Sequence, residues 1–323
     1  MNSDKIFIGT IIKQFRKRRE MTLDTLSEGI CSKDHLCIIE HNRCQPSLYL
    51  LNQISDKLKI NLYDYYNNII SYESIENYLL VNEMFQYIYK YDLDNLQKFL
   101  DNNKDHPHFQ SGELYKNYMY GKAVLESDLF HYDNSLQTCL DVFKKENIPL
   151  CEKNHLYNHI ELLLLNLTAV NYHCLGNEST ALEIYTMLYN QINHIILHST
   201  FETYHHLHFE TELFLNVCSN LAIIKLVNEQ FNETESLLNT ALEIGQNMQS
   251  THCHCELLFC LCELYYYTNR ISEAKQILTD VEVFARYEHK EHLYNEFIHN
   301  AKEMYPELFE QSNRFLISKG LHK

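Results

Sequence analysis

Glycine and proline are scarce in this sequence of 323 residues, which contains only 7 Gly and 4 Pro. Folds rich in β-strands need a turn residue every ~8 to 12 positions, and nucleotide-binding α/β folds need glycine loops, so both classes are disfavoured. Apolar residues make up 45% of the chain, which is enough to bury one large core or two unequal ones. The composition therefore predicts an all-α protein.

Long apolar runs are also missing, because no stretch approaches the ~18 residues of a membrane-spanning helix. The first ten residues, MNSDKIFIGT, lack the basic-then-apolar plan of a signal peptide. The 11 cysteines are odd in number and fall mostly within apolar helical patterns, where a reduced thiol behaves as a small apolar side chain. We therefore expect a cytoplasmic protein without disulfides or contact with a membrane.

The patterns typical of enzymes are absent as well. The sequence contains no GxSxG, Walker, GxGxxG or HExxH motif. We expect neither an enzymatic activity nor a bound cofactor.

Charge is distributed unevenly along the chain, whose net charge is −16. Residues 1–66 carry 6 Lys and 4 Arg against 8 acids, a net charge of +2. Residues 67–323 carry 17 basic and 35 acidic groups, a net charge of −18. Since phosphate binding needs a positive surface, only the N-terminal part is suited to nucleic acid.

Four segments of the first 66 residues have apolar residues at helical spacing. The first segment, Ile8 to Phe15, leads into the basic run 16–19. Gly29 supplies a turn between the second and third segments, and a short fifth helix is expected from Asn61. The residues suited to cap the second and third helices are Thr22 and Ser32, and Pro46 with Ser47 opens the fourth.

The run from Leu26 to Ser47 resembles the helix-turn-helix of the bacterial peptide-pheromone regulators of the Rgg, PlcR and PrgX group. Residues 6–66 are similar to that domain throughout, notably at Gly9, Arg16, Thr22, Leu26, Gly29, Ile30, Cys31, Ser32, Ile39, Glu40, Pro46 and Ser47. Two positions depart from it, since Leu23 replaces a polar residue that usually approaches the DNA backbone and Ile38 replaces a common basic residue. The resemblance implies a five-helix DNA-binding domain over residues 1–66.

By the same resemblance, the first turn of the third helix lies nearest the base edges, as in other helix-turn-helix proteins. The residues expected near base edges are Ser32, Lys33, Asp34 and His35. Those expected near phosphates are Arg16, Arg19, Thr22 and Arg43. Asp34 has a second interpretation as an acid that stabilises the helix N-terminus. His35 either contacts a base, binds a phosphate or merely covers the helix.

The remaining chain shows self-similarity at intervals near 40 residues, most clearly in 166–185, 220–238 and 261–278. These segments resemble tetratricopeptide repeats, with small residues at Ala181, Thr234 and Ala274. In the second and third copies, Glu229 and Asn269 stand where the turn glycine of the repeat would fall. We expect a linker over 67–72 and an α-solenoid over 73–323, with about five helical hairpins and a terminal helix at 289–305.

A solenoid of this length exposes a concave face suited to an extended peptide. The residues that the repeat pattern places along this groove are Asn166, Val170, His173, Asn216, Asn220, Ile223, Glu256, Phe259, Glu263 and Tyr266. Asparagine amides both donate and accept, so Asn216 and Asn220 are suited to a peptide backbone of any sequence. Solvated side chains explain the two Asn and the acidic Glu256 and Glu263 about equally well.

Soft metal ligands cluster between His252 and Cys262, with four Cys and two His in 11 residues. The spacing is not that of a standard zinc site, and on a continuous helix the four thiols face two directions. Pairs such as His194 and His198 or His155 and His159 lack an identifiable third ligand. We therefore predict no metal site.

The leading hypothesis is a homodimeric transcription regulator that binds two half-sites of double-stranded DNA and is controlled by a short intracellular signalling peptide in quorum sensing. The resemblance implies dimerisation through the C-terminal region. One alternative is a metal- or small-molecule-responsive regulator of the same architecture. Another is an adaptor that docks a protein on the solenoid and has lost DNA binding, as Leu23 and Ile38 allow.

Overall fold

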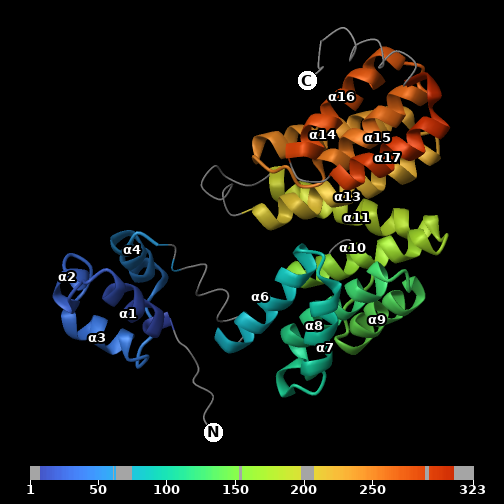
Figure 1. Ribbon diagram of the computed structural model, residues 1–323. Coiled ribbons are helices and arrows are strands. Elements are labelled where there is room, and N and C mark those ends of the chain that lie inside the picture. The colour runs from blue at the N-terminus through green and yellow to red at the C-terminus, as the bar shows by residue number, and fades with distance from the viewer. Residues whose placement is uncertain are drawn as a thin grey trace. The chain divides into compact units, whose positions relative to one another are not determined.

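The computed structural model describes residues 8–60, 62, 75–152, 155–197, 207–287 and 291–308. Within these ranges every regular element is a helix, which confirms the all-α prediction. The chain forms two compact units, Met1–Leu129 and Phe130–Lys323 (Figure 1). The expected linker at 67–72 and most of the fifth helix expected from Asn61 lie outside the described residues, so the predicted domain boundary stays a prediction.

The first unit begins with four helices that enclose a small apolar core. They are α1 (Ile8–Arg18), α2 (Leu23–Ser27), α3 (Lys33–Glu40) and α4 (Leu48–Leu58). Their core contains the residues expected to face inward, among them Ile12, Leu26, Leu36, Ile39 and Ile54, all fully buried.

Capping side chains begin three of these helices where the sequence predicts. The Thr22 hydroxyl accepts a hydrogen bond from the Thr25 amide at 3.0 Å. Ser32 and Ser47 do the same for α3 and α4. Gly29 has φ of +77°, a left-handed conformation that costs glycine little and lets the chain turn between α2 and α3.

A second apolar core in this unit lies between α6 (Ile75–Tyr89), α7 (Leu93–Asn103) and α8 (Gly112–Asp128), with the short 3₁₀ helix η1 (Pro107–Gln110). It shares no residue with the core of α1 to α4. Met84, Leu96 and Phe99 are among its buried residues. The helices α6 to α8 therefore bury their apolar residues against one another and not in the core of α1 to α4.

The second unit is a stack of antiparallel helices (Figure 1). They are α9 (Tyr132–Lys145), α10 (His159–Cys174), α11 (Glu178–Leu197), α13 (His208–Val227), α14 (Phe231–Asn247), α15 (His254–Tyr267), α16 (Ile271–Tyr287) and α17 (Glu291–Met304), followed by η2 (Pro306–Leu308). Each helix packs on the next, and α10 and α15 also contact α13. This is the stacked-hairpin arrangement expected from the repeats.

Turns and small residues of the three repeat copies behave as the pattern predicts. The small residues Ala181, Thr234 and Ala274 are fully buried. Glu229 and Asn269 adopt left-handed φ values of 57° and 61°, as Gly176 does with 80° in the first copy. The backbone therefore keeps the repeat's turn even where the glycine is missing, at a cost of about 1 to 2 kcal/mol for a side chain in this conformation.

None of the helices in the described part of the chain is both long enough and apolar enough to cross a membrane.

Candidate DNA-binding and peptide-binding surfaces

The first turn of α3 presents its polar residues outward. Ser32, Lys33, Asp34 and His35 are all exposed, while Leu36 behind them is buried. The Ser32 hydroxyl accepts from the backbone amide of His35 at 3.2 Å and so caps the helix. The α3 N-terminus is therefore capped and accessible, as base contact requires.

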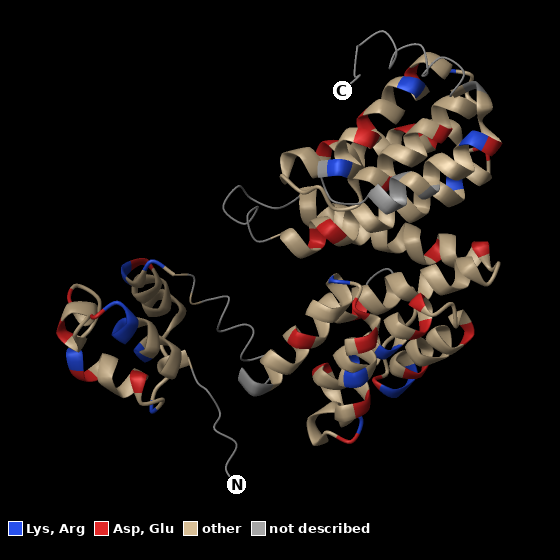
Figure 2. Cartoon of the chain, in the orientation of Figure 1, with Lys and Arg blue, Asp and Glu red and all other residues tan. Residues whose placement is uncertain are grey.

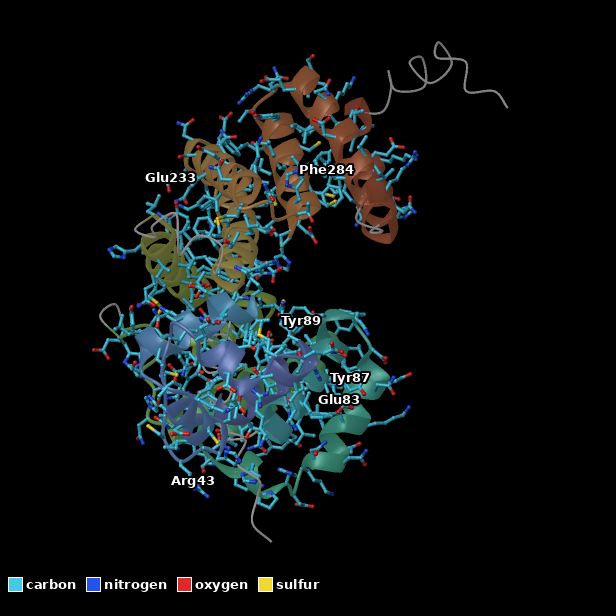
Figure 3. The ribbon with its side chains drawn as sticks, turned by 90° about the vertical axis from the view of Figure 1, so that its left-hand side faces the viewer. Arg43, Glu83, Tyr87, Tyr89, Glu233 and Phe284 are labelled. Carbon is cyan, nitrogen blue, oxygen red and sulfur yellow. The ribbon has the colours of Figure 1, made fainter. Side chains whose placement is uncertain are left out.

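The expected phosphate contacts divide into exposed residues and one internal residue. Arg19, Thr22 and Arg43 are exposed, and Figure 3 shows the Arg43 side chain at the edge of the molecule. Arg19 also donates to the carbonyl of Lys59 at 3.3 Å, beyond the last turn of α4.

Arg16 is different and requires a correction, because its guanidinium is committed within the domain. Its Nε and Nη2 donate to the two carboxylate oxygens of Glu40 at 2.5 and 2.8 Å. Its Nη1 donates to the carbonyl of Met21 at 2.8 Å. The side chains of Arg16 and Glu40 are only 11% and 1% exposed, and the hydrogen bonds that Arg16 donates to Glu40 raise the pKa of Arg16. Arg16 is thus a brace between α1 and α3, and we leave it out of the DNA-contacting set.

A second pair of hydrogen bonds joins α1 to Asn42, which lies just beyond the end of α3. The Thr10 amide donates to Asn42 Oδ1 at 3.2 Å, and Asn42 Nδ2 donates to the Thr10 hydroxyl at 2.7 Å. Beside them, a Cβ on Gly9 would lie 1.8 Å from the carbonyl oxygen of Ile39, so only glycine allows this approach. Sequence reasoning did not find the partners Glu40 and Asn42, since they lie far from α1 along the chain.

The two departures from the family pattern have different surroundings. Leu23 is half-buried and packs against the core of α1 to α4, which explains an apolar residue there. Ile38 is 42% exposed on the outer side of α3. Nothing in the structure explains this exposed apolar residue.

Three asparagines of the predicted groove meet on α10 and α13. Asn166 Nδ2 donates to Asn216 Oδ1 at 2.9 Å, and Asn220 Nδ2 donates to the same oxygen at 3.1 Å. Asn216 Nδ2 in turn lies 3.8 Å from Cys253 Sγ, a weak hydrogen bond. The amides therefore form a network rather than three separate solvated side chains.

The surface around this network, which we call the amide face, comprises Asn166, Val170, His173, Asn216, Asn220 and Ile223. Two of its polar atoms, Asn166 Oδ1 and His173 Nδ1, are buried without a hydrogen-bond partner among the described residues. Val170 is half-buried and Ile223 is exposed. An unused acceptor beside apolar side chains suits a ligand that brings an N–H donor, because an unsatisfied buried acceptor is costly.

Three predicted groove residues of α15 lie elsewhere, which corrects their assignment. The ring of Phe259 stacks on Phe297 of α17 with centroids 4.0 Å apart. The Tyr305 hydroxyl donates to Glu263 Oε1 at 3.0 Å, and the Tyr266 ring lies 4.5 Å from that of Tyr305. This face of α15 is thus occupied by α17 and by Tyr305 after it, and burial raises the pKa of Glu263.

The remaining groove residue, Glu256, is half-buried in the first turn of α15. This helix begins at His254, and Cys253 before it adopts a left-handed φ of 52°. The cysteine-rich segment is therefore not one continuous helix, although the sequence argument assumed that it was. In the described part of the chain, no group of three or more His, Cys, Asp or Glu residues is arranged to hold a metal ion.

A histidine–carboxylate contact that the sequence did not reveal lies at the N-terminal ends of α10 and α13. His159 Nε2 is 2.9 Å from Glu210 Oε1, and the His159 ring stacks on Phe209 at 4.3 Å. Burial alone would raise the pKa of Glu210, but the hydrogen bond with His159, a backbone hydrogen bond and the charge of His159 together lower it. The pair ties α10 to α13 along the same side as the amide face.

No known family model matches the sequence, and no curated protein is detectably similar to it. Solved structures do match. The crystal structure of Bacillus thuringiensis PlcR in complex with the peptide PapR7 and DNA is 18% identical, with a TM-score of 0.72, and the match covers 92% of this chain and 99% of that chain.

Two further crystal structures agree with this one. The Streptococcus dysgalactiae SHP pheromone receptor Rgg2 is 13% identical over 92% of this chain and 100% of that chain, with a TM-score of 0.57. ComR from S. thermophilus, in complex with DNA and its signalling peptide ComS, is 15% identical over 91% and 98%, with a TM-score of 0.55. The likeness to the Rgg, PlcR and PrgX group is therefore confirmed in the fold.

Proposed function

We propose that this chain is a transcription regulator that binds DNA through α2 and α3 and is controlled by a short peptide held on the amide face. The observation that carries the proposal is the network of Asn166, Asn216 and Asn220, which leaves one acceptor unused on a chain that also has an outward-facing helix-turn-helix. PlcR and ComR, which share the fold, were each crystallised with a peptide and DNA.

On the DNA side, Ser32, Lys33, Asp34 and His35 approach base edges, while Arg19, Thr22 and Arg43 contact phosphates. Lys and Arg are marked in Figure 2, and the N-terminal 66 residues have a net charge of only +2. Phosphate neutralisation supplies much of the affinity for DNA, so one copy is a modest binder. Two domains held at fixed spacing in a homodimer then engage two half-sites.

On the peptide side, Asn166 and Asn220 contact the main chain and Val170 and Ile223 contact side chains. Amide groups bind a peptide backbone whatever its sequence, whereas the apolar residues select among peptides. The net charge of −18 over residues 67–323 favours a peptide that carries Lys, Arg or a free amino terminus. No observation favours the metal-responsive alternative.

Selection from a random duplex library followed by fluorescence anisotropy tests DNA binding by the full chain. We expect a selected sequence to bind at least ~10³-fold more tightly than random duplex at physiological salt, as specific regulators do. Equal affinity for the two duplexes would support the adaptor alternative instead.

Binding to an array of short synthetic peptides, followed by calorimetry on the best of them, tests the amide face. Asn166→Ala removes the unused acceptor and should weaken the best peptide about 2- to 10-fold, the value of one hydrogen bond. Asn232→Ala, an exposed position on α14, is the matched control and should leave the affinity unchanged. Equal losses in the two variants would contradict the assigned site.

A further inference from the structure

An exposed ion pair joins the two helices of the helix-turn-helix. Lys33 Nζ lies 2.6 Å from Asp24 Oδ2, and the two side chains are 53% and 67% exposed. Lys33 opens α3 and Asp24 lies in the first turn of α2. The pair therefore lies at the N-terminal ends of both helices, on the surface proposed to meet DNA.

Lys33 is the only Lys or Arg between residues 22 and 40, a stretch that also contains Asp24, Glu28, Asp34 and Glu40. A lysine ammonium is a compact charge on a flexible stem, so it can turn to a phosphate as easily as to a base. Phosphate contacts carry no sequence information, whereas contacts to base edges do. A neighbouring residue that restrains the Lys33 side chain therefore affects how well the protein distinguishes one DNA sequence from another.

We propose that Asp24 is a positioning residue that withholds Lys33 from phosphates and so sharpens sequence discrimination; this rests on the proposed DNA binding. On random DNA, a phosphate must displace Asp24 from Lys33 and also approach the carboxylate. On the preferred sequence, an acceptor on a base edge takes over part of the role of Asp24. The carboxylate thus weakens non-specific binding more than specific binding.

The test compares Asp24→Asn with Glu28→Gln in the full chain, using a random-sequence duplex and the duplex selected by the wild type. Glu28 is an exposed acid at the end of α2, so its replacement changes the charge equally without touching Lys33. Exposed ion pairs contribute little to stability, so circular dichroism should show both variants folded.

We expect Asp24→Asn to bind random duplex about two- to five-fold more tightly, the range of an exposed charge pair. Its plot of log affinity against log salt should steepen by about 0.9, the value for one more phosphate contact. The ratio of selected to random affinity should fall. In a Lys33→Ala background, Asp24→Asn should leave the slope unchanged.

The inference would be overturned if Asp24→Asn and Glu28→Gln increased the affinity for random duplex equally. It would also be overturned if the increase from Asp24→Asn persisted in the Lys33→Ala background. Either result would show general repulsion between the acid and DNA. If the wild type binds its selected duplex specifically and Asp24→Asn has the same affinities and salt slope as the wild type, only the inference is overturned and the proposed function stands. Failure of the wild type to bind either duplex would overturn the proposed function and the inference with it.

Discussion

Replacement of Arg16 by alanine should destabilise the region around α1 and α3, although Arg16 itself is not one of the proposed DNA contacts. The substitution removes two hydrogen bonds to the Glu40 carboxylate and one to the Met21 carbonyl. It leaves Glu40, whose side chain is 1% exposed, as an uncompensated charge. Most of the lost stability therefore comes from the buried and unpaired Glu40 carboxylate, and less from the three lost hydrogen bonds.

The size of the effect follows from that burial. Removing one member of a buried ion pair costs about 3 to 5 kcal/mol, against a total stability of about 5 to 15 kcal/mol for a typical domain. Since each ~1.4 kcal/mol is a factor of ten, the open state of this region should become roughly 10² to 10³·⁵ times more populated.

Hydrogen exchange followed by mass spectrometry is the suitable assay, because it reports opening segment by segment in a chain with two units. Amides of α1 and α3 should exchange faster by that factor in Arg16→Ala, while those of α10 and α13 should keep their protection. Lys17→Ala, an exposed cation one position along, is the matched control.

The double replacement Arg16→Met with Glu40→Leu sharpens the test. It removes both charges and keeps apolar volume, so much of the protection should return. Exchange in Arg16→Ala as slow as in Lys17→Ala would refute the assignment of Arg16 as an internal brace and return it to the candidates for phosphate contact.

Three further outcomes are expected. Gly9→Ala should destabilise the N-terminal helices by about 3 kcal/mol in exchange experiments, the upper part of the range for overpacking, because its Cβ would meet the Ile39 carbonyl. Gly29→Ala, where the space is open, should cost only the ~1 to 2 kcal/mol of a left-handed side chain. Equal costs for the two variants would contradict the contact of Gly9 with Ile39. Burial raises the pKa of Glu263 above its ordinary 4.5, so the folded state holds this proton more tightly than the unfolded state. Stability should therefore fall as pH rises from 4.5 through the folded-state value, and Glu263→Gln should flatten that part of a melting-temperature profile; identical profiles would contradict the buried site. Burial raises the pKa of the Cys262 thiol to about 12 and also raises the pKa of Cys260. Iodoacetamide at pH 8 should therefore modify the exposed Cys44 and Cys174 first. Early labelling of Cys260 in peptide mapping would contradict the packing of α15.

Local features of the fold could be predicted from the sequence because the physics that sets them is local. Thr22, Ser32 and Ser47 begin helices since a side-chain oxygen satisfies an amide three residues ahead. The periodic apolar residues of α1 to α4 are buried as expected. Even Glu229 and Asn269 turn the chain as glycine would, because the repeat fixes the turn.

Partners far apart along the chain could not be predicted in this way. Arg16 and Glu40 are both suited to an exposed surface when taken singly, and only packing of α1 on α3 buries them together. Repeat spacing placed Phe259 and Glu263 in a groove, but Phe297 of α17 and Tyr305 after it pack against them, and the repeat pattern contains no such contacts. Asn166 and Asn216 were predicted to line one groove, yet their mutual hydrogen bond appears only in the structure.

The most direct test of the central claim is the affinity of the full chain for its selected duplex, measured by anisotropy with and without a saturating amount of the best-binding peptide. A regulator of this kind should show coupling of about 1 to 3 kcal/mol, a change in DNA affinity of about 5- to 150-fold. By linkage, the duplex should change the peptide's affinity by the same factor. An identical DNA affinity with and without bound peptide would contradict the claim that the amide face controls DNA binding.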